Sequence, residues 1–225
     1  PYLDLDHPVT VGAEANFNEG VVLDYSFDKW RLQPTQQQVG TENMPVAFSD
    51  VREAAPKLGT DVTVASFNVL NYFPTLGNTD PKCKPYTDRE GNPTTANRCK
   101  MRGAFDEDSF EQQQSKIVNA INQLDASVVA LEEIEDSSDF GKDRDDAIKK
   151  LVEALNAKGG NWSYVPSPAS IPATGDDVIR TGIIYKKDAV SYVDGSTEIL
   201  DSPDFTNARA PLAVSYTHLR AHETD

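Results

Sequence analysis

The stretch Asp61-Val-Thr-Val-Ala-Ser-Phe-Asn-Val69 decides the fold class of this 225-residue chain. Its β-branched and apolar residues predict a buried strand. A second run, Ser127-Val-Val-Ala-Leu131, predicts another buried strand and leads directly into Glu132-Glu133-Ile134-Glu135-Asp136. Between the two, residues 109–124 carry apolar residues at helical spacing, with Asp108 or Ser109 placed to cap the helix.

Further helices and strands are predicted downstream. Apolar spacing predicts a second helix that Asp145 caps and Gly159-Gly160 ends. Further strands are expected over residues 162–165, 178–185, 190–193 and 210–214. The order β-α-β-α followed by several strands is that of a layered α/β domain.

The N-terminal part of the chain has a different character. Residues 9–34 alternate apolar and polar side chains around the turn signal Asn18-Glu19-Gly20, which predicts a small β structure. Residues 35–59 show little periodicity and suggest a linker or a packed irregular segment. The first residues lack both Met and a signal-peptide pattern, so we expect a mature or trimmed start.

The charge balance limits how the protein can bind nucleic acid. A formal net charge of −15 argues against binding driven by Lys and Arg alone. An enzyme escapes this argument when divalent cations bridge its carboxylates to a phosphate. Acidity also serves solubility or a salty habitat, and that alternative stays open. No apolar run of about 18 residues occurs, so no membrane contact is predicted.

Cys83 and Cys99 lie in a segment rich in Pro, Asn, Thr and Gly. A disulfide between them would close a loop of about fifteen residues and contribute roughly 3 kcal/mol. Such a bond indicates an oxidising compartment. Two unrelated thiols are the alternative, whereas a structural zinc site lacks the four ligands that it needs.

Glu133 follows a buried strand, and the strand ends of layered α/β sheets commonly hold ligands and metals. Its carboxylate suits Mg²⁺, which takes only one or two protein carboxylates and keeps several waters. The alternative is that Glu132, Glu133, Glu135 and Asp136 simply begin a solvated loop. Both interpretations stay open at this point.

Asn68 interrupts an apolar strand, so its amide either ties down the backbone or faces a site. Because Asn does not titrate, it suits holding a phosphate oxygen or orienting an acid. Arg180 lies on a predicted strand and Arg209 directly precedes another, and the planar guanidinium matches phosphate bidentately. Surface ion pairs are the alternative for both, and Asp177 could pair with Arg180 or face a cleft.

Several ordered motifs resemble the extracellular bacterial nucleases of the endonuclease/exonuclease/phosphatase superfamily, relatives of pancreatic deoxyribonuclease. The motifs are Val64-Ala-Ser-Phe-Asn-Val-Leu-Asn-Tyr-Phe73, Arg102-Gly-Ala104, Val129-Ala-Leu-Glu-Glu-Ile-Glu135, Asp177-Val-Ile-Arg-Thr-Gly-Ile-Ile-Tyr185 and Asn207-Ala-Arg-Ala-Pro-Leu212. Upstream, Gly20-Val-Val-Leu-Asp-Tyr-Ser-Phe27 resembles the tail of an OB-like domain. The resemblance covers nearly all of residues 1–212.

The resemblance implies the N-terminal half of a four-layer α/β sandwich at residues 61–213. It places a linker at 37–60 and the remnant of a small β-rich, OB-like domain at 1–36. It implies a secreted or periplasmic nuclease that hydrolyses phosphodiester bonds in DNA, or also RNA, with Mg²⁺, Mn²⁺ or Ca²⁺. A base activates water while the metal stabilises charge on the phosphate.

Roles follow residue by residue from the resemblance. Asn68 matches the strand Asn that contacts the scissile phosphate, and Glu133 matches the metal-binding Glu. Arg209 matches an arginine that grips a substrate phosphate, and Arg102 and Arg180 are expected to line the nucleic-acid groove with Asp177. The segment Gln112-Gln113-Gln114 departs from the arginines that relatives often carry there, which puts phosphate contact near that helix in doubt.

The superfamily's later motifs, an Asn-His-Leu-Lys-like strand, Gly-Asp-Phe-Asn and an Asp-His pair, do not occur before Leu212. We therefore expect the chain as given to be truncated and inactive. Residues 214–225 resemble a translated sequencing adapter, so His218 and His222 are expected to have no function. The alternatives are a phosphodiesterase acting on lipid or inositol head groups and a non-catalytic secreted module. The sequence leaves endo- versus exonuclease action, the preferred metal and the oligomeric state undetermined.

Overall fold

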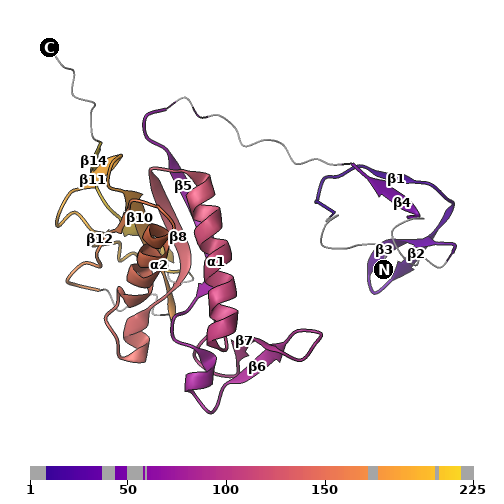
Figure 1. Cartoon of the computed structure of the whole chain (residues 1–225), viewed down its shortest axis with the longest axis horizontal. Coiled ribbons are helices and arrows are strands. Elements are labelled where there is room, and N and C mark those ends of the chain that lie inside the picture. The colour runs from indigo at the N-terminus through magenta and orange to yellow at the C-terminus, as the bar shows by residue number, and fades with distance from the viewer. Residues whose placement is uncertain are drawn as a thin grey trace. The chain divides into compact units, whose positions relative to one another are not determined.

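The computed structural model describes residues 9–36, 44–49, 58, 60–171, 177–205 and 208–218, with only the backbone of His218. The chain divides into two compact units, residues 1–57 and 58–225 (Figure 1). Each unit is built around its own strand pairings. None of the described helices combines the length and the apolar character needed to cross a membrane.

In the first unit, the described residues form two antiparallel strand pairs. β1 (Ala15–Phe17) pairs with β4 (Val46–Phe48), and β2 (Val21–Ser26) pairs with β3 (Lys29–Pro34). Strand β4 lies inside the segment predicted to be a linker, which corrects that prediction. Three residues are too few to show a period of two, so only the partner strand reveals them. The rest of the expected linker, 37–43, 50–57 and 59, lies outside the described residues, as do residues 1–8.

The second unit is organised by a four-stranded sheet in the order β5-β8-β10-β9. Strand β5 (Val64–Tyr72) runs parallel to β8 (Val128–Glu135), and β10 (Ile179–Lys186) is antiparallel to both β8 and β9 (Trp162–Tyr164). Both predicted core strands are present. β8 runs four residues further than expected and carries most of the acidic segment with it.

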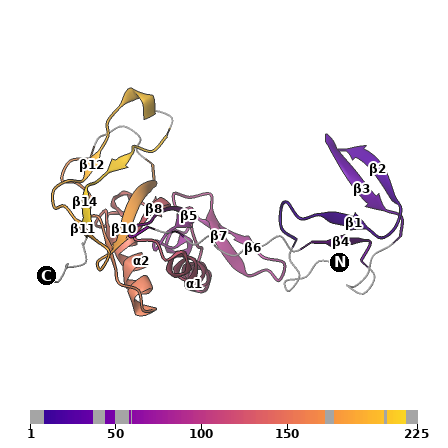
Figure 2. The same cartoon turned by 90° about the horizontal axis from the view of Figure 1, so that it is seen from above.

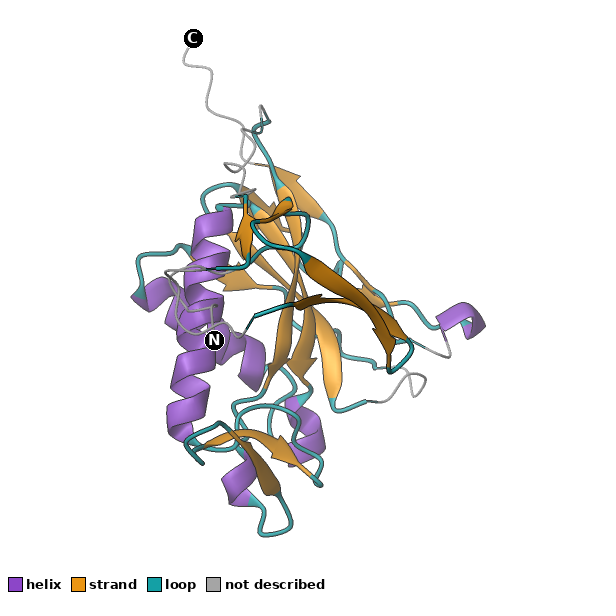
Figure 3. Cartoon of the chain, turned by 90° about the vertical axis from the view of Figure 1, so that its right-hand side faces the viewer, coloured by secondary structure: helices purple, strands orange, loops and turns teal. Residues whose placement is uncertain are grey.

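Helices α1 (Glu107–Leu124) and α2 (Asp146–Ala157) lie side by side against the sheet (Figure 2). Their apolar stripes meet the side chains of β5 and β8 in one core. Its fully buried members include Tyr72, Phe110, Ile121, Leu131, Ile134, Ile148, Leu151, Leu155, Trp162 and Ile184. Figure 3 shows the helices together along one side of the strands. The α/β class predicted from the sequence is confirmed.

Short strand pairs extend the second unit beyond its main sheet. β11 (Val190–Tyr192) pairs with β14 (Tyr216–His218), and β12 (Glu198–Ile199) pairs with β13 (Leu212–Ala213). The segment expected to be non-native therefore contributes strand β14. The Tyr216 ring lies 5.5 Å from that of Tyr185, on the sheet face opposite to Ile184 and the helices. Residues 219–225, including His222, lie outside the described part.

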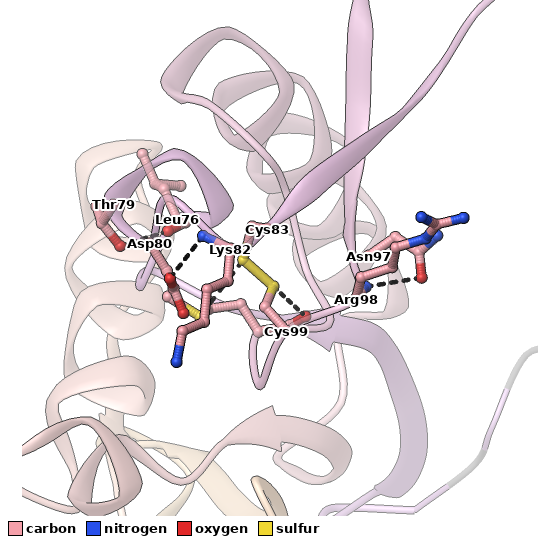
Figure 4. The surroundings of a disulfide bond; sticks show 9 residues. Leu76, Thr79, Asp80, Lys82, Cys83, Asn97, Arg98 and Cys99 are labelled. Atoms are coloured by element: carbon pink, nitrogen blue, oxygen red, sulfur yellow. Dashed lines mark hydrogen bonds between the residues drawn. A yellow bond between two sulfur atoms is a disulfide. The ribbon is translucent and has the colours of Figure 1, made fainter.

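The segment around the two cysteines is more ordered than expected. It contains η1 (Gly77–Thr79) and the hairpin of β6 (Lys84–Thr87) with β7 (Pro93–Asn97). The structure pairs Cys83 with Cys99 in a disulfide that joins the two ends of this hairpin (Figure 4). The remaining short helices are η2 (Ser137–Phe140) and η3 (Pro203–Phe205).

Helix α1 starts two residues before its predicted start. Its N-cap is Asp106, whose side chain accepts a hydrogen bond from Ser109 N at 3.0 Å. The carboxylate thereby satisfies one of the backbone donors that the first helical turn leaves unpaired. At α2 the predicted cap residue Asp145 is in place, but its side chain makes no cap bond and serves other partners.

Replacing the cap of α1 tests this boundary. We expect Asp106→Ala to lower the free energy of unfolding by about 1 kcal/mol, because an N-cap carboxylate is lost. Asp106→Asn should retain most of the stability, since Asn is an equally good cap. Urea unfolding followed by circular dichroism measures both, and equal losses for the two variants would contradict the assignment.

Candidate functional site

The adjacent ends of β5 and β8 are both distorted. Leu70, Asn71 and Glu133 have left-handed backbones, with φ of 50°, 54° and 62°. The pairing of β5 with β8 shifts register between Asn68 and Tyr72. Non-glycine residues are rare in this conformation, which costs about 1–2 kcal/mol each. Such strain gathers at functional sites, so this end of the sheet is the first candidate.

The distortion in β8 lifts two glutamates out of the hydrophobic core. Leu131 and Ile134 are both buried beneath the helices, although strict alternation would send them to opposite faces. The pairing of β8 with β10 also shifts register here, between Arg180 and Gly182. Glu132 and Glu133 occupy the resulting bulge, the first exposed and the second half-buried.

Asn68 lies directly across from this bulge, because it is the register partner of Glu132. Its Oδ1 accepts a hydrogen bond from Leu70 N at 2.8 Å, which leaves the amino group with two donors for another acceptor. Ser66 Oγ donates to Glu132 Oε1 at 2.7 Å on the same exposed face. The sequence prediction named Glu133 as a site residue but did not name Glu132 or Ser66. Because side chains alternate along a strand, the residue after the buried Leu131 could have been predicted to face solvent.

Gln113 of α1 holds the β5 distortion in place. Its Nε2 donates to Leu70 O at 2.7 Å and approaches the carbonyls of Val69 and Asn71 at 3.5 and 3.4 Å. Gln113 Oε1 is buried, and no partner for it occurs among the described residues. Gln113 therefore has a structural role, because its amide donates to the backbone carbonyls that the irregular end of β5 leaves exposed.

Gln114 serves the same corner of the fold through Tyr72. The Tyr72 hydroxyl donates to Gln114 Oε1 at 2.6 Å. Burial raises the pKa of Tyr72 above its ordinary value, and the charges of Glu135 and Glu153 raise it further. The phenol therefore remains a neutral donor that fixes β5 against α1.

A groove of about 900 Å³ opens beside Asn68 and the first turns of α1. Its wall combines polar and apolar residues, and the charged ones include both signs. The polar lining residues are Asn68, Asn71, Asp88, Asn92, Thr94, Thr95, Arg102, Asp106, Asp108, Ser109, Gln112, Gln113 and Lys116. Arg102 lies at the wall of this groove and shares it with Asn68.

Asp177 joins two of the predicted phosphate-binding arginines. Arg102 donates to both carboxylate oxygens, at 3.2 and 2.7 Å, and Arg209 donates to Oδ2 at 3.1 Å. Partial burial alone would raise the pKa of Asp177, but the hydrogen bonds and charge of Arg102, with Val178 N and Arg209, lower it. The carboxylate is therefore an anion that holds both guanidinium groups, and its partner is not Arg180.

Arg180 takes a buried position instead. Its side chain is 8% exposed and donates to Asp145 Oδ1 at 2.8 Å and to Arg144 O at 3.1 Å. Asp145 also accepts from Ser167 N and Oγ, at 2.8 and 2.6 Å. Arg180 lines a recess of only about 50 Å³. Arg180 therefore forms an ion pair, as in the alternative considered for it, but the pair is buried and not at the surface. The Nε of Arg180 has no hydrogen-bond partner among the described residues.

The end of the acidic segment is structural. Glu135 is fully buried and accepts hydrogen bonds from Thr75 N, Thr75 Oγ1 and Ser137 Oγ, at 2.9, 2.9 and 2.7 Å. Asp136 is also buried and forms an ion pair with Arg144. The interpretation of the whole acidic run as a solvated loop is therefore wrong for these two residues.

The donors at the bulge suit a hard cation without enclosing one. Among the described residues, no group of three or more His, Cys, Asp and Glu side chains could form a closed metal site. Glu132 and Glu133 offer carboxylate oxygens on neighbouring positions, and Mg²⁺ typically uses one or two carboxylates together with water and substrate phosphate. The residues present therefore fit an open Mg²⁺ site.

No protein-family model and no curated protein sequence matches the chain. Among solved structures it is similar to a crystal structure of ANGEL2, a 2′,3′-cyclic phosphatase, in complex with adenosine-2′,3′-vanadate. That similarity has a TM-score of 0.37 and 17% identity, over 71% of this chain and 38% of the other. A second ANGEL2 structure gives a TM-score of 0.30 and 20% identity, over 46% and 27%. The chain spans less than two-fifths of those proteins. At these TM-scores the similarity is too weak to support a shared fold or function.

The support that Gln113 gives to the bulge can be tested with an isosteric change. We expect Gln113→Glu to lower the free energy of unfolding by about 1–3 kcal/mol, because a carboxylate oxygen would face the backbone carbonyls of β5. The exposed neighbour variant Gln112→Glu is the matched control and should change stability little. Urea unfolding measures both, and similar losses would show that the amide has no special role.

The left-handed backbone of Glu133 generates a second prediction. We expect Glu133→Gly to be about 1 kcal/mol more stable than Glu133→Ala, because glycine adopts this conformation without steric cost. Thermal and urea unfolding of the two variants give the difference. A glycine variant that is less stable than the alanine variant would mean that position 133 is not left-handed in solution.

Proposed function

We propose that the chain belongs to a metal-dependent phosphodiester hydrolase of the endonuclease/exonuclease/phosphatase superfamily. The observation that carries this proposal is the position of Asn68 beside the Glu132–Glu133 bulge, at the adjacent ends of two parallel strands. An amide donor next to two adjacent glutamates suits the joint binding of a phosphate and a cation. The ordered sequence motifs support the same superfamily.

Each residue has a distinct role in this proposal. The Asn68 amino group, with Oδ1 held by Leu70 N, is oriented to donate to a non-bridging phosphate oxygen. Glu133, with Glu132 beside it, would hold Mg²⁺. Bound there, the cation supplies charge neutralisation at the phosphate and the leaving oxygen. Asn68 and the glutamates thus bind and orient, and we assign none of them as the general base.

The substrate we propose is nucleic acid, with DNA as the first candidate. The groove beside Asn68 is much larger than a single phosphate needs, and Arg102 and Lys116 contribute positive charge to a wall that also carries three aspartates. Arginine pairs well with backbone phosphates. The disulfide between Cys83 and Cys99 supports a secreted or periplasmic location, where such bonds persist.

The test uses the complete native protein that contains this catalytic region. With Mg²⁺ it should degrade plasmid DNA, and chelation of the metal should abolish the activity. We expect Glu133→Gln to lower kcat by at least about 10²-fold, because removing one preorganised electrostatic contact costs that much. Glu90→Gln, at an exposed position in the β6–β7 loop, is the matched control.

The alternative substrates are separate arms of the same assay. Release of phosphate or head group from sphingomyelin or phosphoinositide vesicles, with DNA left intact, would replace nucleic acid by a lipid substrate. If the Glu133→Gln variant hydrolysed DNA at the full rate, the assignment of Glu133 as a metal ligand would be wrong. An absence of hydrolysis in every arm would favour the non-catalytic module.

A further inference from the structure

The carboxylate of Asp177 is saturated by hydrogen bonds. Its Oδ1 accepts from Arg102 at 2.7 Å and from the backbone N–H of Val178 at 2.8 Å. Its Oδ2 accepts from Arg102 at 3.2 Å and from Arg209 at 3.1 Å. A carboxylate offers about four lone-pair positions, so Asp177 has no capacity left for a metal ion or a substrate proton. Its contribution must pass through the two arginines.

The two arginines are held without being neutralised. One carboxylate faces two guanidinium groups, so the cluster keeps one positive charge in a chain whose formal net charge is −15. The side chains of Arg102 and Arg209 remain 45% and 42% exposed. Each guanidinium has five N–H donors, and only a minority of them bond to Asp177. Two guanidinium groups that share one carboxylate and keep open donors suit the oxygens of a phosphate.

The cluster is also tied to the ends of both core strands. Gly103, next to Arg102, packs so closely on β5 that an added Cβ would lie 2.7 Å from Asn71 O. Val178, next to Asp177, accepts a hydrogen bond from Asp136 N at 2.9 Å, just beyond β8. Arg102 also shares the large groove with Asn68. The fold thus places Arg102 in the groove that contains Asn68, whereas Arg209 lines a separate small recess together with Asp177 and Arg180.

We propose that Asp177 is a positioning residue that holds Arg102 and Arg209 as a clamp for a backbone phosphate of a nucleic-acid strand. The shared chemistry is a phosphate oxyanion, and the choice of a polymer as its source rests on the proposed function. Asp177 aligns two side chains that come from loops far apart in the sequence. Their rotamer freedom is restricted before the strand arrives, which lowers the entropic cost of binding.

The decisive variant is Asp177→Asn, because two explanations predict opposite signs. If the arginines acted only through net charge, removing an acidic group would strengthen the binding of a polyanion. The clamp predicts that the same variant binds a short oligothymidylate about tenfold more weakly, because both guanidinium groups lose their common anchor. Fluorescence anisotropy on the 225-residue chain, without added metal, measures the dissociation constant.

Salt dependence separates positioning from charge. We expect Arg102→Ala and Arg209→Ala each to weaken binding about tenfold and to reduce the slope of log K against log salt by about 0.7, as for one lost phosphate contact on a single strand. Asp177→Asn should leave that slope nearly unchanged, since both arginines keep their charge. Arg89→Ala, in the exposed β6–β7 loop, is the control and should change neither quantity. Urea unfolding identifies any variant that has lost its fold.

Nuclear magnetic resonance of the arginine Nε–Hε groups tests the site itself. Oligothymidylate should shift the signals of Arg102 and Arg209 together in the wild-type chain, and Asp177→Glu should restore part of the shift lost in Asp177→Asn. Equal or tighter binding by a folded Asp177→Asn variant would overturn the clamp. If inorganic phosphate saturated the site and oligothymidylate produced no response, the ligand would be free phosphate and the proposed nucleic-acid strand would be wrong. These readouts need no hydrolysis, so the clamp can fail or hold independently of the catalytic function, which the plasmid assay on the complete protein tests.

Discussion

The parallel pairing of β5 with β8 is the constraint on which the rest of the second unit depends. It connects two segments separated by the whole of α1 and by the disulfide-linked hairpin. Both strands are buried on the helix side, so their apolar residues fix the register. Once that register is set, Asn68 must lie across from Glu132. The polar residues at the strand ends are therefore brought together by hydrophobic packing elsewhere in the same strands.

The bulges give this pairing its exposed polar groups. A regular β8 would direct one of its two adjacent glutamates into the core, where an unpaired carboxylate is strongly unfavourable. The left-handed backbone at Glu133 avoids that outcome and keeps Ile134 packed beneath the helices. On β5, Gln113 supplies the donor that the displaced carbonyls need. Backbone strain and a helix side chain thus act together to expose polar groups at one edge of a well-packed sheet.

Charge is distributed unevenly around this edge. The buried acids Glu135 and Asp136 are matched by hydroxyl donors and by Arg144, so they stabilise the fold. Asp177 leaves its two arginines with an excess of positive charge at the surface. A strongly acidic chain can therefore offer a local binding surface for an anion. The net charge describes solubility and long-range repulsion, whereas the paired side chains decide what binds at close range.

The sequence by itself determined the α/β class, the two core strands and both helices. These features depend on local periodicity, which needs no knowledge of partners. Only the tertiary structure decided that Glu132 faces Asn68, that Arg180 is buried against Asp145, and that Asp177 serves Arg102 and Arg209. Register shifts and long-range ion pairs follow from how distant segments meet, and no spacing within one segment encodes them.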